Sequence, residues 1–180
     1  YPIADRLSAH LDSDLKRLDF SQLRGDLGAT HYLGNYSLVF GGDGLWMDTQ
    51  IVVPEGRIRD LSGIFVDLGE LDGHLSANAV LHGAPTRLSG EVHAELDDVT
   101  VYGEHFEAGV ATAWMDDGVL TLDDLSLRRR DEAILARGTI GHEFVMNTEI
   151  LTDGVRLETL DHLQSMAIPA SGELVGDVRV

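Results

Sequence analysis

Apolar and polar residues alternate with a period of two along most of this chain, and this pattern constrains the fold more than any other feature. From Leu45 to Val53, every second residue is Leu, Met, Thr, Ile or Val. The same alternation runs from Phe106 to Trp114 and from Leu174 to Val180. Side chains two residues apart lie on one face of a β-strand, so each segment is expected to have one apolar and one polar face.

Turn-forming sequences separate these segments at the spacing of β-hairpins. Gly-rich, Asp-Gly and Pro-containing stretches occur at 41–44, 54–56, 72–73, 83–85, 116–118 and 153–154. Such residues adopt the positive φ angles or fixed φ angles that tight turns between antiparallel strands require. The sequence therefore predicts an all-β chain built as an antiparallel β-meander.

Two segments also fit a helix. In residues 3–18, Ile3, Leu7, Leu11, Leu15 and Leu18 recur at nearly helical spacing, yet the segment also alternates as a strand with Leu7, Ala9, Leu11 and Ser13 in one phase. Because the rest of the chain is strand-like, the strand interpretation is favoured. A second, weaker helical pattern covers Leu157 to Met166.

Short matches recur at an interval of about 27 residues, which indicates one β-unit used several times within a single segment, residues 1–180. The run 96–101 recurs at 122–127, and the tripeptide 61–63 recurs at 88–90. In the first pair, the apolar phase slips by one residue at Asp-Asp, as a β-bulge would cause. Repeated bulges curl a sheet, so we expect a taco-like open groove with an apolar interior. A β-sandwich or a β-solenoid is the alternative.

Composition excludes several classes of function. The chain has 13 basic and 31 acidic residues and a net charge of −18, so it lacks the basic surface that nucleic acids or anionic membranes attract. Without cysteine it has no disulfide, thiolate metal site or cysteine nucleophile. No apolar run approaches the roughly 20 residues of a membrane helix. We therefore expect no nucleic-acid partner and no transmembrane segment in these 180 residues.

Catalytic and metal-binding motifs are also missing. The histidines near carboxylates, His74, His93 and His142, have no paired-histidine spacing, and no Gly-x-Ser-x-Gly motif occurs. The run 41–44 faintly resembles a calcium-binding β-roll repeat but occurs once, so turn formation is the better explanation. Arg128 to Arg130 is the one basic cluster; it would meet anionic headgroups or, as we favour, be neutralised by Asp131 and Glu132 at a hairpin tip. We predict no catalytic residue, no metal and no cofactor.

Residues 88–101, 117–127, 136–141 and 168–180 resemble the repetitive Gly, Asp and aliphatic strands of the AsmA-like and TamB-like envelope proteins. The resemblance extends over Leu61 to Val180. It implies a groove that crosses the periplasm of a Gram-negative bacterium, within a parent protein anchored in the inner membrane. It further implies phospholipid transport or outer-membrane assembly, with phospholipid acyl chains and an outer-membrane β-barrel as partners. Both ends of the chain, Tyr1 and the strand-like 174–180, suggest an internal segment of such a protein.

The leading hypothesis is thus a non-enzymatic periplasmic groove module. Its rival is an extracellular or periplasmic β-sandwich or solenoid that serves binding or adhesion. For the groove, the apolar phases of the central strands are predicted to line the interior and to contact lipid: Val92, Leu96, Val99, Val101, Phe106, Val110, Trp114, Leu120, Leu122, Leu125 and Leu127.

Overall fold

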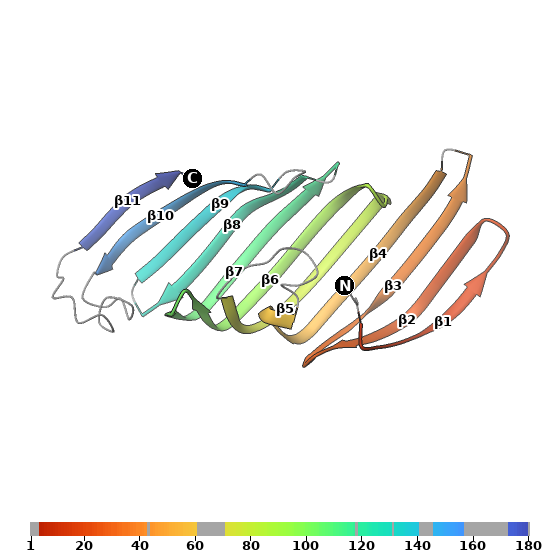
Figure 1. Cartoon of the computed structure of the whole chain (residues 1–180), viewed down its shortest axis with the longest axis horizontal. Helices are drawn as coiled ribbons and strands as arrows, with labels where there is room; N and C mark the ends of the chain where they lie inside the picture. The colour runs from red at the N-terminus through yellow and green to blue at the C-terminus, as the bar shows by residue number, and fades with distance from the viewer. Residues whose placement is uncertain are drawn as a thin grey trace.

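The described residues form one antiparallel sheet of eleven strands. The computed structural model describes residues 4–42, 44–60, 71–117, 119–130, 132–140, 146–156 and 173–179. The strands follow one another across the sheet in chain order, which makes the fold a meander (Figure 1). They are β1 (Arg6–Ser13), β2 (Arg17–Leu27), β3 (Thr30–Gly41), β4 (Gly44–Arg57), β5 (Leu71–Ala84), β6 (Arg87–Val101), β7 (Glu104–Asp116), β8 (Val119–Arg129), β9 (Glu132–Ile140), β10 (Met146–Arg156) and β11 (Glu173–Arg179).

The all-β prediction is confirmed, and so is the open, curled form of the sheet. Strands β1 and β11 are its two edges, and the described strands form neither a second packed sheet nor the coils of a solenoid. Strand β1 settles the ambiguity in residues 3–18 in favour of a strand. The weak helical pattern at Leu157 to Met166 lies outside the described residues. One short helical turn, residues 58–60, follows β4.

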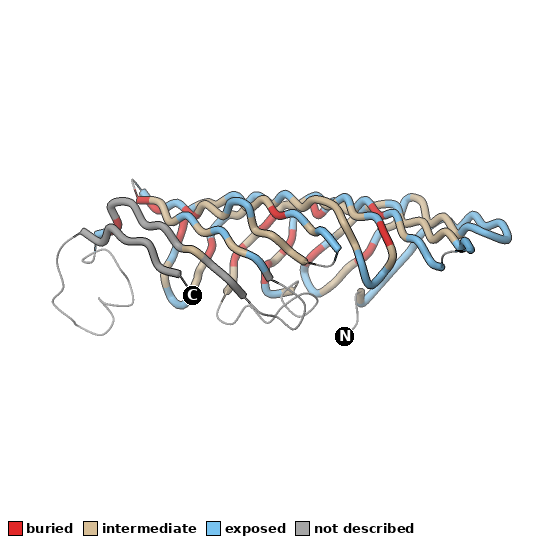
Figure 2. Tube along the Cα trace, turned by 90° about the horizontal axis from the view of Figure 1, so that it is seen from above, coloured by how far each residue is buried: buried red, intermediate tan, exposed pale blue. Residues whose placement is uncertain are grey.

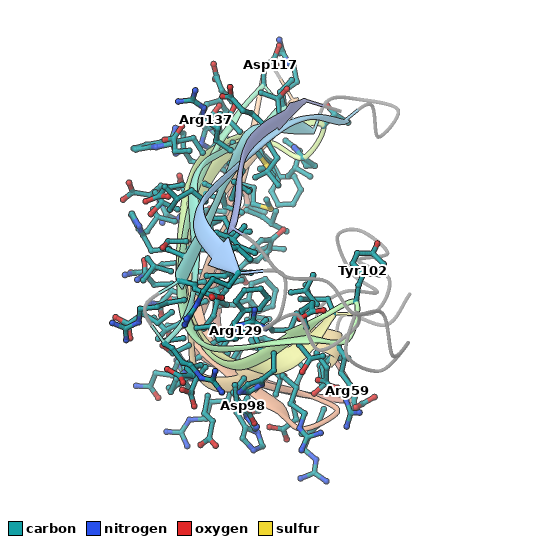
Figure 3. All side chains as sticks on the ribbon, turned by 90° about the vertical axis from the view of Figure 1, so that its left-hand side faces the viewer. Arg59, Asp98, Tyr102, Asp117, Arg129 and Arg137 are labelled. Carbon is teal, nitrogen blue, oxygen red and sulfur yellow. The ribbon has the colours of Figure 1, made fainter. Side chains whose placement is uncertain are left out.

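Viewed along the sheet, the strands curve into an open C, with Asp117 at one lip and Tyr102 at the other (Figure 3). Register shifts mark where strands bend. Strand β8 shifts against β9 between Leu122 and Leu125, at the predicted Asp-Asp position. Strand β6 changes its inward phase between Leu96 and Val99, where Asp98 has a φ of 52°. The two predicted phase slips are therefore present in the structure, and both help to curl the sheet.

Gly73 on β5 shows how tightly neighbouring strands meet at such a bend. It lies opposite the Asp98 bulge, where the pairing of β5 with β6 shifts between Asp72 and His74. Gly73 has a φ of 142°, and a Cβ atom there would lie 2.9 Å from the Asp98 carbonyl oxygen and from the Val99 Cα. Only glycine fits this close approach of two backbones.

The hydrophobic core lies on the concave side of the central strands. We call its buried members the buried cluster: Val53, Ile58, Leu75, Val99, Phe106 and Leu127. Figure 2 shows that buried residues follow the middle of the sheet, whereas the β1–β2 hairpin at one end is mostly exposed. Beside the cluster, Ala77, Ala94 and Ala111 pair with one another across β5, β6 and β7. These small side chains relieve crowding on the inner side of a bend.

Among the described residues, no helix is both long and apolar enough to cross a membrane.

Candidate functional site: the apolar concave face

The two faces of the sheet differ sharply in chemistry. Residues paired directly across antiparallel strands share a face, so the register identifies each face. On β6, Glu91, His93, Glu95 and Asp97 alternate with half-buried Val92, Ala94 and Leu96. Carboxylates and other polar side chains predominate on the convex face, and aliphatic side chains cover the concave face. The convex face also exposes scattered large apolar residues: Trp46, Val52, Val80, Val110, Trp114 and Leu135. Arg137 illustrates this: it points outward from the wall of the C and pairs with Glu149 (Figure 3).

Nine of the eleven predicted lining residues lie on this concave face. They are Val92, Leu96, Val99, Val101, Phe106, Leu120, Leu122, Leu125 and Leu127, as their pairing partners and burial show.

The other two placements were wrong. Val110 pairs with Glu95 and Trp114 pairs with Glu91, so both side chains lie on the convex face, where they are 50% and 47% exposed. The reason is a phase change within β7: Phe106 is buried inward, but beyond Glu107 and Ala108 the inward positions are Gly109, Ala111 and Ala113. If the alternation that begins at Phe106 is extended without this phase change, Val110 and Trp114 are wrongly placed on the concave face.

Exposure divides the concave face into two parts. In the buried cluster, Val99 is 0% and Phe106 is 5% exposed, so these side chains have almost no surface left for a ligand. Val99→Asp is expected to destabilise the fold, because it would bury an unpaired charge. Nearer the lip marked by Asp117, a continuous line of paired residues is more open, except at Thr49, which is 8% exposed. We call it the open row: Leu11, Phe20, Tyr36, Thr49, Leu81, Gly90, Met115 and Leu120.

The open row carries no charged side chain over eight strands, although the chain has 13 basic and 31 acidic residues. Its two polar side chains are largely occupied or sheltered. The Thr49 hydroxyl donates a hydrogen bond to the Asn35 carbonyl oxygen at 3.2 Å. Tyr36 packs against Phe20, with ring centroids 5.9 Å apart, and burial raises the pKa of its phenol. The row thus presents an uncharged surface to anything on the concave side.

An ionic cluster lies at the opposite end of the same face, near the β8–β9 tip. Arg129 is only 8% exposed; its guanidinium lies 3.1 Å from Glu104 and 3.2 Å from Glu132 and covers the Phe106 ring at 5.9 Å. Glu132 also pairs with Arg156 at 3.5 Å. The predicted neutralisation of the basic cluster is confirmed for Arg129 by Glu132, whereas Asp131 lies outside the described residues. Sequence reasoning missed that Arg129 faces inward, although Arg129 continues the odd phase of Leu125 and Leu127.

The lip at the β5–β6 and β7–β8 tips is polar and solvent-exposed. The Arg87 guanidinium lies 3.8 Å from the Asp117 carboxylate, and the two side chains are 71% and 70% exposed. Ser89 donates a hydrogen bond to Asp116 at 3.2 Å. Charged groups of both signs therefore border the uncharged row on this side.

A shallow hollow on the convex face is bordered by mostly polar residues and two leucines: Pro54, Glu55, His74, Leu75, Ser76, Glu95, Leu96 and Asp97. It lies where β4 shifts register against β5, between Val53 and Gly56. In the part of the chain that the structure describes, no three His, Asp or Glu side chains are arranged to hold a metal ion. The hollow is therefore a polar surface depression beside a bulge.

No family model, no curated protein and no solved structure matches this chain.

Proposed function

We propose that the concave face binds the acyl chains of phospholipids and that the chain is a non-enzymatic groove module. The observation that carries this proposal is the distribution of charge: the open row on the inside of the curled sheet has no charged side chain, whereas the outside carries carboxylates among scattered apolar residues. Burying hydrocarbon on such a face stabilises the complex by roughly 0.8 kcal/mol per methylene removed from water. The headgroup stays hydrated at the lip.

Hydrocarbon suits this face better than an unfolded polypeptide does. The backbone donors and acceptors of the inner strands are already paired within the sheet. A peptide laid on the face would have to leave its own backbone groups without partners, and that is costly in an apolar setting. An acyl chain has no such groups, so the proposal commits to lipid.

The wider role we propose follows the resemblance to AsmA-like and TamB-like proteins. In this role the module carries phospholipid between membranes, in support of outer-membrane assembly, in the periplasm of a Gram-negative bacterium. An outer-membrane β-barrel is the proposed partner of the parent protein. A nearly uniform aliphatic lining favours sliding, because it offers a bound chain no preferred stop.

Two neighbouring residues on β5 give a matched test. Leu81 is half-buried in the open row, whereas Val80 is 43% exposed on the convex face. We expect Leu81→Asp to reduce the lipid that co-elutes with the protein by about tenfold or more, and Val80→Asp to leave it unchanged. Lipid would be quantified by native mass spectrometry and by extraction, after incubation with vesicles of phosphatidylethanolamine and phosphatidylglycerol.

Urea unfolding and circular dichroism would establish that both variants fold. Met115→Asp, in the same row but next to a hairpin tip, is the substitute should Leu81→Asp unfold the sheet. Equal lipid retention by the folded Leu81→Asp and Val80→Asp variants would refute the assigned face. A wild-type protein that never retains lipid would refute the function and favour a role in protein or glycan binding.

A further inference from the structure

We propose that a bound acyl chain crosses the strands along the open row, with its polar end at the β7–β8 tip and its methyl end toward β3. This inference rests on the proposed function and adds an orientation to it. Three features of the described residues support it: the slope of the row relative to the lip, the position of the charges, and the length of the row.

From β3 to β8, the open row approaches the lip as it runs toward the C-terminus. On β3, Tyr36 lies five residues before Gly41, the last residue of the strand. On β5, Leu81 lies three residues before the last residue, Ala84. On β7, Met115 lies one residue before Asp116, and its partner Leu120 lies one residue after Val119. The row is therefore deep within the concave face at β3 and reaches the lip at β7 and β8.

Charge follows the same gradient. At the shallow end, the exposed pair of Arg87 and Asp117 lies beside the row and offers one group of each sign. A zwitterionic headgroup carries a phosphate and an amine, which complement these two charges. At the deep end, Phe20 and Tyr36 supply aromatic surface that suits a methyl terminus.

The part of the row from β8 to β5 fits the length of one chain in this orientation. From Leu120 on β8 to Leu81 on β5 the row crosses three strand intervals, a distance of roughly 14 Å at about 4.8 Å per interval. One leaflet's chains span about half of a hydrocarbon core that is about 30 Å thick, or roughly 15 Å. A chain that starts at the β7–β8 tip therefore ends near Leu81. A chain that reaches Tyr36 crosses five strand intervals, roughly 24 Å, and passes Thr49, which is 8% exposed.

A chain placed along the strands would meet a worse surface. From Leu81 it would run down β5 over Ala77 to Leu75, which is only 8% exposed and belongs to the buried cluster. On β8 the same course leads to Leu127 and then to Arg129, whose charge is engaged by Glu104 and Glu132. Crossing the strands avoids both the closed core and the ionic cluster.

The absence of native cysteine permits a direct test with single reporters. Leu120→Cys and Leu81→Cys, each labelled with a small fluorophore, would be loaded from vesicles of phosphatidylcholine that carries a spin label near the carboxyl end or near the methyl end of one chain. We expect the carboxyl-end label to quench the Leu120→Cys reporter at least twofold more than the Leu81→Cys reporter. The methyl-end label should give the opposite order. Val110→Cys on the convex face is the control and should be quenched by neither.

The outcomes separate this proposal from the function on which it rests. Lipid that co-elutes with every variant but quenches in the reverse order, or equally at both reporters, overturns the orientation and leaves lipid binding intact. If lipid co-elutes with neither the variants nor the wild type, both the orientation and the lipid-binding function are overturned. Labelling at Met115 in place of Leu120 repeats the test if the first reporter disturbs folding.

Discussion

Tyr36 links the concave face to a measurable titration. Burial raises the pKa of its phenol above the ordinary value of 10.0, and burial together with nearby Asp26 does the same for Tyr32. A group whose pKa is raised by folding contributes stability that is present below its unfolded pKa and is lost as the pH rises through its folded pKa.

We therefore expect the free energy of unfolding to fall as the pH rises above about 10. This decline should be smaller in the double variant Tyr32→Phe, Tyr36→Phe, as measured by urea unfolding across the alkaline range. Tyr102→Phe, at an exposed hairpin turn, is the control. Bound lipid should raise the pKa of Tyr36 further in a spectrophotometric titration, because it removes more water from the phenol. An alkaline decline unchanged in the double variant would contradict this assignment.

Single positions show where sequence reasoning succeeds and where it stops. The outward position of Glu91, His93 and Glu95 follows from period two, because no bulge interrupts that part of β6. Phe106 and Val110 look equivalent in sequence but lie on opposite faces. The phase change between them coincides with the Asp98 bulge on the neighbouring strand, to which β7 is paired. The phase change in β7 thus follows from its pairing with β6, and the sequence of β7 alone does not indicate it.

At the scale of elements, turn chemistry and alternation predicted the meander, and the two Asp-Asp slips were found where expected. The turns predicted at 72–73 and 153–154 were wrong, because β5 and β10 continue through them with a shift of register. Strand β1 was ambiguous because its helical and strand patterns use the same leucines. Pairing of Leu11 with Phe20 on β2 decides it, and such a contact between strands is not encoded in the local pattern. The bend at Pro54 and Glu55 in β4 was predicted only as a turn, since a proline there fits both a turn and a bulge.

The bulge in β6 supports a prediction at this scale. Asp98 has a φ of 52°, a region that Asp tolerates and that β-branched residues strongly resist. Asp98→Val should lower the free energy of unfolding by about 1–3 kcal/mol through backbone strain. Asp98→Gly should change it by less than about 1 kcal/mol. The exposed contact of Asp98 with His105, at 3.4 Å, contributes little to either result.

The neighbouring residue supplies the control for this strain. Asp97 is also exposed but has no positive φ, so Asp97→Val should be tolerated better than Asp98→Val in urea unfolding. Equal losses for the two valine variants would mean that the φ angle of Asp98 is not what shapes the bend.

At the scale of the whole molecule, the alternation of residues predicted one apolar face of the sheet. The repeated bulges predicted that the sheet curls so that this face is concave. The division of that face into the buried cluster and the open row was beyond sequence reasoning. Leu127 and Leu120 both occupy inward positions on β8, yet one is buried and the other half-exposed. Their difference depends on how closely the curved sheet brings distant strands together, which is a property of the assembled curvature.

Charge and lipid binding should respond differently to salt, because they reside on opposite faces. The net charge of −18 is spread over a sheet one layer thick, so like charges repel across the convex face. Raising the ionic strength from about 0.01 M to about 0.15 M shortens the Debye length from about 30 Å to about 8 Å. The melting temperature should therefore rise by several degrees, as followed by circular dichroism.

Retention of zwitterionic phosphatidylcholine should change less than twofold, because the open row holds hydrocarbon without charge and exposed ion pairs at the lip add little. A steep loss of lipid with salt, at unchanged or higher stability, would instead place the main binding contacts on the charged groups of the lip.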